Sequence, residues 1–217
     1  MTAQSVGSGG IRSGSPIAQG GLDTRIPGAL FLGIGAAFLI VTMLAASIAP
    51  GYDFHGGKIS DLGVIGETAI LFNVLLVAIG VLNAVGGYLV YRHVGRVWLF
   101  ATFLLAGAGA MGAGIFPLNT GGLHSIFALL AFVLFNLEAL AMAAVLRGPM
   151  RLLSAVAGVV GVIYVVVMLI GDGGNPAIFG AIGHGGSERM IAYPVMLWLL
   201  ALGGYLLGSP VLGRGRR

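Results

Sequence analysis

The chain has 217 residues, of which 58% are hydrophobic and 8% are charged. Because a soluble domain carries about 25% charged residues, this chain has too little charge to cover a surface that faces water. The composition therefore excludes an ordinary soluble globule and a disordered chain, and it predicts a polytopic membrane protein. The absence of cysteine excludes disulfides and thiolate metal sites.

Six apolar segments follow a polar start that is rich in Gly and Ser. A helix needs about 20 apolar residues to cross the hydrocarbon core, and each segment is long enough. Residues 1–27 lack the apolar stretch of a signal peptide, so we expect a disordered cytoplasmic tail there and a basic cytoplasmic tail at 209–217. The sequence predicts an all-α, six-transmembrane-helix bundle over residues 28–208, with spans at 28–49, 67–91, 97–116, 124–146, 152–171 and 188–208.

The basic residues divide unequally between the two sides of this bundle. Nine of the eleven fall in the two tails and in the short connections after the second and fourth spans, whereas Lys58 and Arg189 belong to the other side. Because loops rich in Lys and Arg stay in the cytoplasm, we expect both termini inside a multi-pass protein of the plasma membrane. The net charge of +4 then serves topology, and no nucleic-acid partner is expected.

The three longer connections face the outside in this topology and hold most of the polar side chains. Long loops tend to carry function in a compact fold. Ser187 is predicted to cap the sixth helix with Glu188 in its first turn, and Arg189 is expected to pair with a carboxylate such as Asp61 or Asp172. In a second interpretation, Ser60 and Asp61 cap a short helix. The predicted binding or structural cluster consists of Ser60, Asp61, Asn119, Asp172 and Arg189.

Histidines and carboxylates on the same side give this cluster two chemical interpretations. His124, His184 and Glu188 are candidate catalytic residues, because imidazole and carboxyl groups suit acid–base catalysis. His55, His124 and His184 also match the ligand count of a zinc or iron site, although no HExxH motif is present and the sequence requires no cofactor. The simplest alternative is that these side chains cap helices and bind loop backbone.

One carboxylate lies inside a predicted span. Glu138 is fourteen residues into the fourth span, about 21 Å deep at 1.5 Å per residue. Since a charge at this depth is costly, we expect Glu138 to face the bundle and to be paired or protonated. Asn83 reaches nearly the same depth in the second span and is the predicted partner. The pair is interpreted as a hydrogen bond between helices or as a proton relay.

Glycine is frequent inside the spans. The third span contains Gly107, Gly109, Gly112 and Gly114, and the sixth contains Gly204 and Gly208 in a GxxxG pattern. Small residues let helix backbones approach closely in lipid. We expect tight packing within one bundle, with a homo-oligomer face as the alternative.

Several short motifs occur together across the membrane region. They are SDLG at 60–63, GIFP at 114–117, His124, and a final pattern made of Gly185, Glu188, Arg189, Tyr193, Pro194 and Trp198. In this combination the chain resembles the prokaryotic membrane-protein family catalogued as domain of unknown function 998, over about residues 24–207. The resemblance implies six helices and an outer-face polar cluster, and it implies no activity.

Three functions are compatible with these residues. The first is a structural or lipid-interacting protein, with membrane lipids as partners and the outer cluster joining the helices. The alternative is an outer-leaflet enzyme, such as a metal-dependent hydrolase, that acts on a lipid or lipid-linked substrate. The third is a small transporter or channel, against which stand the single deep carboxyl group and the lack of an inverted repeat.

Overall fold

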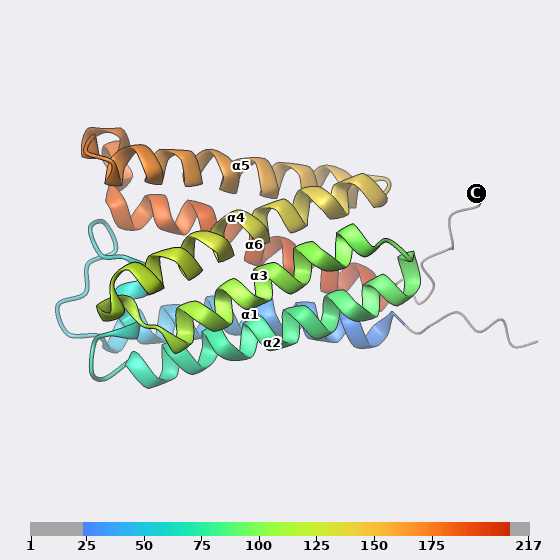
Figure 1. The fold of residues 1–217 in the computed structure, drawn as a ribbon, viewed down its shortest axis with the longest axis horizontal. Coiled ribbons are helices and arrows are strands. Elements are labelled where there is room, and N and C mark those ends of the chain that lie inside the picture. Colours follow the sequence, from blue (N-terminus) through green and yellow to red (C-terminus); the bar gives the residue numbers. More distant parts are fainter. Residues whose placement is uncertain (1–23, 209–217) are drawn as a thin grey trace, which may run out of the picture.

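Six long helices run back and forth along one axis in the computed structural model, which describes residues 24–208 (Figure 1). Each is long and apolar enough to cross a membrane, so the prediction of an all-α bundle with six spans is confirmed for the described residues. Residues 1–23 and 209–217, where tails are predicted, lie outside them. The helices are α1 (Arg25–Ile48), α2 (Ala69–Val94), α3 (Val97–Ile115), α4 (Gly122–Val145), α5 (Pro149–Asp172) and α6 (Gly183–Gly208).

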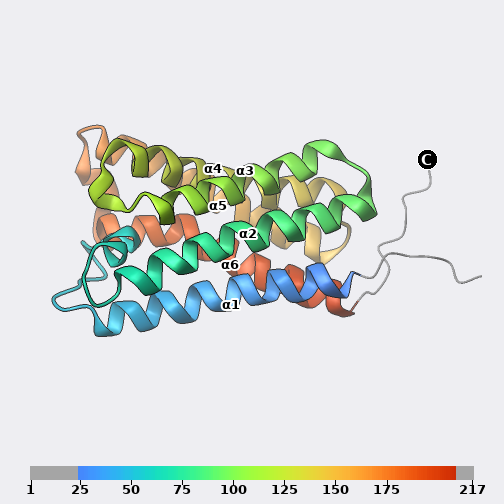
Figure 2. The ribbon, with the colours of Figure 1, turned by 60° about the horizontal axis from the view of Figure 1, so that its bottom comes forward.

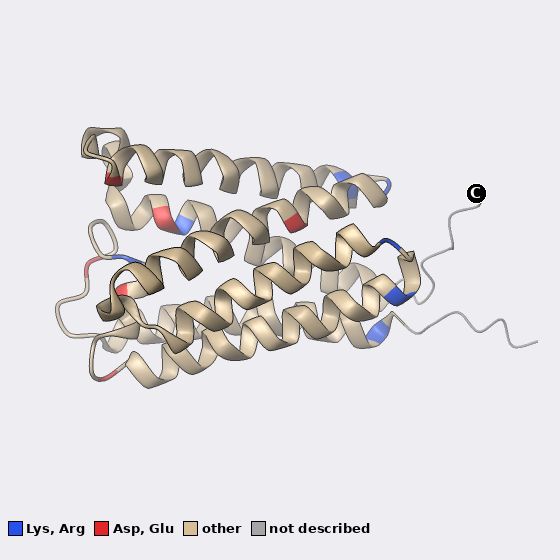
Figure 3. Ribbon diagram, viewed as in Figure 1, with Lys and Arg blue, Asp and Glu red and all other residues tan. Residues whose placement is uncertain are grey.

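The two ends of the bundle differ in their connections (Figures 1 and 2). At the end that we call the loop end, residues 49–68, 116–121 and 173–182 contain the short 3-10 helices η1 (Ile59–Gly63), η2 (Leu118–Thr120) and η3 (Pro176–Ile182). At the opposite end, the turn end, residues 95–96 and 146–148 join the helices. Most acidic residues gather at the loop end and most basic residues at the turn end, as expected from the sequence (Figure 3). The exceptions are Lys58 and Arg189 at the loop end and Glu138 inside the bundle.

Neighbouring helices pack in an order that brings the first and last together. α1 contacts α2 and α6, α3 lies between α2 and α4, and α5 packs against α4 and α6 (Figure 2). Aromatic side chains such as Phe31 and Phe103 fill the interior, while Ile40 is 66% and Val159 48% exposed on the outside. A helix bundle with apolar side chains on both faces suits a lipid environment.

Close backbone approach explains the glycines of α3. A Cβ atom on Gly80 or Gly107 would collide with the carbonyl oxygen of the other, and Gly109 lies against the backbone of Ala131 on α4. These glycines therefore serve packing within the bundle, as small residues do in membrane helices. In contrast, no atom of the described residues lies within 4 Å of a Cβ position on Gly204 or Gly208.

The start of α6 differs from the prediction by five residues. Gly183 has φ +67°, and a Cβ atom there would collide with His55, so this position requires glycine. Because the helix begins at Gly183, Ser187 is not its cap. The Ser187 hydroxyl instead donates to the carbonyl oxygen of Gly183 at 2.9 Å, and Glu188 lies in the second turn.

Candidate functional site

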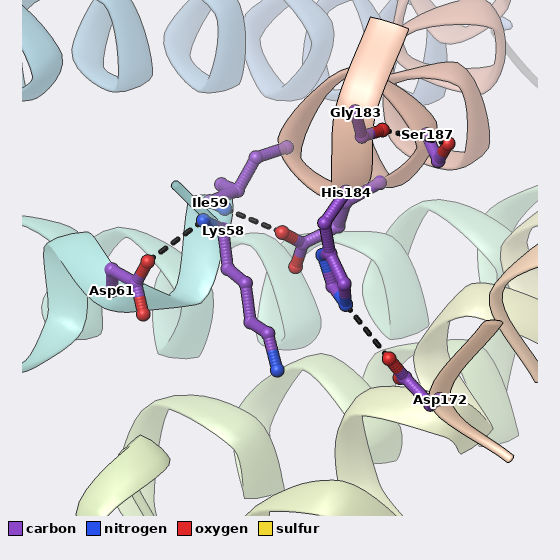
Figure 4. A network of polar contacts seen from close by, with 8 residues as sticks. Lys58, Ile59, Asp61, Asp172, Gly183, His184 and Ser187 are labelled. Carbon is purple, nitrogen blue, oxygen red and sulfur yellow. Dashed lines mark hydrogen bonds and ion pairs between the residues drawn. The ribbon is translucent and has the colours of Figure 1, made fainter. Parts of the chain in front are cut away.

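The SDLG motif forms η1, a short helix that lies across the loop end of the bundle. The backbone N–H of Lys58 donates to the Asp61 carboxylate at 2.7 Å, so Asp61 caps η1 and does not pair with Arg189 (Figure 4). The amide of Asn73 on α2 donates to the carbonyl oxygen of Gly63 at 2.8 Å. The Ser60 hydroxyl makes no hydrogen bond to another described residue. Both ends of η1 are thus fixed.

Glu188 of α6 holds η1 from the other side. One carboxylate oxygen accepts the backbone N–H of Ile59 at 2.5 Å (Figure 4). Glu188 is 3% exposed, and its second oxygen has no hydrogen-bond partner among residues 24–208. Ile59 and Leu62 are also buried, so η1 covers the loop end of the bundle core.

Arg189 is enclosed by the first long loop and by its own helix. Nη1 donates to the carbonyl oxygens of Phe54 (3.1 Å), Gly57 (3.2 Å) and Gly185 (2.8 Å). Nη2 donates to the hydroxyl of Tyr52, and the guanidinium lies 4.7 Å from the centre of the Phe54 ring. Four hydrogen bonds and an aromatic face thus surround this buried cation.

The ion pair expected for Arg189 is therefore wrong. Carbonyl oxygens of the loop accept the hydrogen bonds of the guanidinium. In the part of the chain that the structure describes, the one ion pair joins His184 and Asp172 at 2.9 Å (Figure 4). That pair is partly exposed and links the end of α5 to the start of α6. Asn119, a predicted member of the same cluster, is exposed in η2.

Tyr52 connects Arg189 to the backbone before η1, and its role is not evident from the sequence. Its hydroxyl accepts from Arg189 and donates to the carbonyl oxygen of Lys58 at 2.8 Å. Burial raises the pKa of Tyr52 to about 12, against the opposing effect of the Arg189 charge. The signal available in the sequence is the pair of aromatic residues, Tyr52 and Phe54, in a polar loop that faces a lone arginine.

Asp53, between these aromatic residues, orders the same loop. Its carboxylate accepts the backbone N–H groups of Gly56 (2.7 Å) and His55 (3.1 Å). These two hydrogen bonds lower the pKa of Asp53, because they stabilise the charged form. The loop that encloses Arg189 is thus itself folded by a side-chain turn.

The three histidines of the predicted metal site lie apart. Among residues 24–208, no three His, Asp or Glu side chains are grouped so that they could hold a metal ion. His124 binds the carbonyl oxygen of Phe116 at 2.8 Å, and His184 binds Asp172. His55 contributes its backbone carbonyl oxygen to the N–H of Gly185. A backbone carbonyl oxygen and a carboxylate thus bind the rings of His124 and His184, and the three histidines do not form the predicted metal set.

A cavity of about 70 Å³ lies beneath η1, inside the loop-end half of the bundle. Side chains of α1, α2, α3, α4, α6 and η1 line it, and α5 does not contribute. Its α4 residues run from His124 to Asn136, about 18 Å at 1.5 Å per residue. The lining therefore extends along the bundle axis. Its apolar lining residues are Phe38, Ile59, Phe72, Leu76, Ile79, Ala110, Ala113, Ala128, Ala131, Phe132, Phe135, Ile191, Ala192, Val195 and Met196.

Four polar residues complete the lining: Ser60, His124, Glu188 and Asn136. The Asn136 amide donates to the carbonyl oxygens of Phe132 and Ile191 and lies against Gly161 of α5. The structure thus brings two of the three candidate catalytic residues, His124 and Glu188, to one cavity and leaves His184 outside it. Because a carbonyl oxygen accepts from Nδ1–H of His124, its Nε2 is unprotonated in the neutral ring and can accept a hydrogen bond.

Glu138 and Asn83 are in contact deeper in the bundle, as their matching depth indicates. The Asn83 amide donates to one Glu138 carboxyl oxygen at 2.8 Å and to the carbonyl oxygen of Phe103 at 3.2 Å. Both side chains are fully buried and lie outside the cavity lining. Within the described residues no chain of hydrogen bonds connects this pair to the loop end.

These features define a multi-pass integral membrane protein with a polar cluster and an apolar cavity at one end of a six-helix bundle. The family described as protein of unknown function (DUF998) matches residues 32–205, so the chain belongs to this family. Its η1, His124, Glu188 and Arg189 all fall inside the matched region. No curated protein and no solved structure matches the chain.

Proposed function

We propose that this chain is a lipid-binding membrane protein whose cavity holds part of the apolar chain of one membrane amphiphile. The observation behind the proposal is the division of the lining: fifteen of its nineteen residues are apolar. Ser60, His124 and Glu188 lie at its loop end. An amphiphile has the same layout, with a long apolar body and a polar group at one end, and ligand sites in proteins combine an apolar lining with a few polar groups.

Packing physics supports an apolar occupant. Water is disfavoured in a cavity whose walls offer it few hydrogen bonds, whereas a hydrocarbon chain makes many dispersion contacts there. The α4 part of the lining includes the small residues Ala128 and Ala131, and these two and Phe132 are incompletely buried. Neighbouring lipids supply such chains at high concentration.

The charge distribution supports an outer-leaflet head group. Arg92, Arg96, Arg147 and Arg151 belong to the turn end, which we assign to the cytoplasm because positive loops remain inside. The loop end then faces outward. A bound amphiphile would direct its polar group to the level of η1 and its chain toward the middle of the membrane.

The other two functions have less support. Catalysis by His124, His184 and Glu188 needs the three side chains in one pocket, and His184 is bonded to Asp172 outside the cavity. Transport needs a polar path across the bundle, and the buried Glu138 is bonded to Asn83 without a link to the loop end.

Photolabelling in lipid nanodiscs tests the proposal. The probe is a long-chain alcohol with a diazirine in its alkyl chain, and labelled residues are located by mass spectrometry. We expect saturable labelling of lining residues such as Ala131 and Met196. Ala128→Leu fills part of the cavity and should weaken saturable labelling at least about tenfold, which corresponds to about 1.4 kcal/mol.

Ala144→Leu is the matched control, because Ala144 is exposed on the same helix, away from the cavity. It should label like the wild type. Labelling that does not saturate, or that spreads over outward residues such as Val159, would overturn the proposal. So would undiminished labelling of Ala128→Leu.

A further inference from the structure

The polar groups at the loop end of the cavity are acceptors of hydrogen bonds. His124 can accept through Nε2, since its Nδ1–H is bonded to the carbonyl oxygen of Phe116. Glu188 has one oxygen bonded to Ile59 and a second without a hydrogen-bond partner in the described chain. The Ser60 hydroxyl, which is also free of protein partners there, both donates and accepts.

No lysine or arginine side chain lines this cavity. Arg189 directs its Nη groups to the carbonyl oxygens of the 54–57 loop, of Gly185 and to Tyr52, and Lys58 is outside the lining as well. A phosphate or carboxylate head group would thus meet the Glu188 carboxylate with no cation on the cavity wall to oppose the repulsion. This repulsion between two negative charges disfavours the binding of anionic head groups.

The Glu188 carboxylate also lacks a cationic partner within ion-pair distance in residues 24–208. It is 3% exposed, and a buried charge is costly unless it is paired and hydrogen-bonded. A primary ammonium group would supply a positive charge and three N–H donors. Three acceptors, on Ser60, His124 and Glu188, are available at this end of the cavity.

We infer that the cavity selects an amphiphile with a primary ammonium head group, held by the Glu188 carboxylate. This inference rests on the proposed lipid-binding function and names its ligand class. Ion pairing with Glu188 supplies the preference for a cation, and the apolar lining supplies affinity for the chain. The bond between Ile59 and Glu188 keeps the carboxylate in place.

Competition against the photoreactive alcohol tests the inference with four compounds of equal chain length. Dodecylamine, dodecanol, dodecanoate and dodecyl phosphate are added to protein in nanodiscs at pH 8.5. Protein-free nanodiscs give the partition of each compound, so that potency is expressed per molecule in the membrane. We expect the amine to compete about tenfold more strongly than the alcohol, a difference of about 1.4 kcal/mol, and the two anions to compete least.

Glu188→Gln keeps an oxygen for the N–H of Ile59 and replaces the other oxygen by an amide donor. It should remove the advantage of the amine and leave competition by dodecanol unchanged, which also shows that the variant is folded. Asp172→Asn is the matched control, because Asp172 is a carboxylate of the same end that does not line the cavity. This control should retain the full preference for the amine.

The possible failures are distinguishable. If the alcohol competes but the amine is no better, or if Glu188→Gln keeps the amine preference, the head-group inference is wrong and lipid binding stands. If none of the four compounds competes, lipid binding itself is wrong and the inference falls with it.

Discussion

Replacing Arg189 with lysine separates the charge of this residue from the shape of its guanidinium group. In the structure Arg189 makes three hydrogen bonds to carbonyl oxygens and one to Tyr52, and it lies over the Phe54 ring. Lysine keeps the charge and can reach carbonyl oxygens with one ammonium. It cannot also hold Tyr52 through a second nitrogen or stack a planar group on Phe54.

The magnitude follows from the contacts that lysine cannot make. One hydrogen bond from a charged group contributes about 1.5–3 kcal/mol, and a desolvated cation–π contact contributes up to about 2 kcal/mol. We therefore expect Arg189→Lys to lower the free energy of unfolding by about 2–4 kcal/mol. In a chain of this length each kcal/mol shifts the unfolding midpoint by roughly 2–4 °C, so a fall of roughly 4–16 °C is expected.

Thermal unfolding of detergent-purified protein measures this shift, and hydrogen exchange locates it. Exchange should increase in residues 52–58, the segment whose carbonyl oxygens bind Arg189. Arg151→Lys is the control, because Arg151 is an exposed arginine of the turn end and should leave the midpoint unchanged. A midpoint within about 2 °C of the wild type for Arg189→Lys, with unaltered exchange, would show that the carbonyl contacts do not stabilise the loop.

Further predictions concern other contacts of the bundle. Because burial raises the pKa of Tyr52 from its ordinary value near 10 to about 12, the folded state should lose stability as pH rises from about 10 to about 12. Tyr52→Phe should reduce that loss in pH-dependent unfolding, and at pH 7 it should cost about 1.5–3 kcal/mol for the bond from Arg189. Gly107→Ala should lower stability by about 1–3 kcal/mol through its collision with α2, whereas Gly204→Ala, in open space, should not; equal midpoints would contradict the close packing. Asp172→Asn removes a partly exposed ion pair and should change stability by at most about 1 kcal/mol, so a larger loss would assign this pair a structural role that the geometry does not indicate.

The fold was predictable because it depends on properties that a sequence displays directly. Six apolar stretches of membrane-spanning length predict six helices, because a helix pairs every backbone N–H and C=O group within its own segment in lipid. The contact between Glu138 and Asn83 was also predictable, because each depth follows from position along a helix and a buried carboxyl group needs a partner.

The site was less predictable because its contacts depend on where loops lie in three dimensions. The sequence contains several carboxylates that could pair with Arg189. Nothing in it shows that carbonyl oxygens of the loop accept the hydrogen bonds of the guanidinium instead. The early start of α6 places Gly183 against His55, which belongs to a distant loop. The cavity itself is a property of side chains from five helices, and hydropathy does not record how completely they fill the space between them.

One helix of the bundle has a distinct position relative to the proposed ligand. α5 packs against α4 and α6 but contributes no residue to the cavity, and its Gly158 and Gly161 lie behind the lining residue Asn136. Its half-exposed outer residues, such as Val156 and Val159, can therefore be substituted without reshaping the ligand space. That outer face is the part of the membrane region best suited to carry a spectroscopic label or a surface attachment, because a reporter there would leave both the cavity and the Arg189 contacts intact.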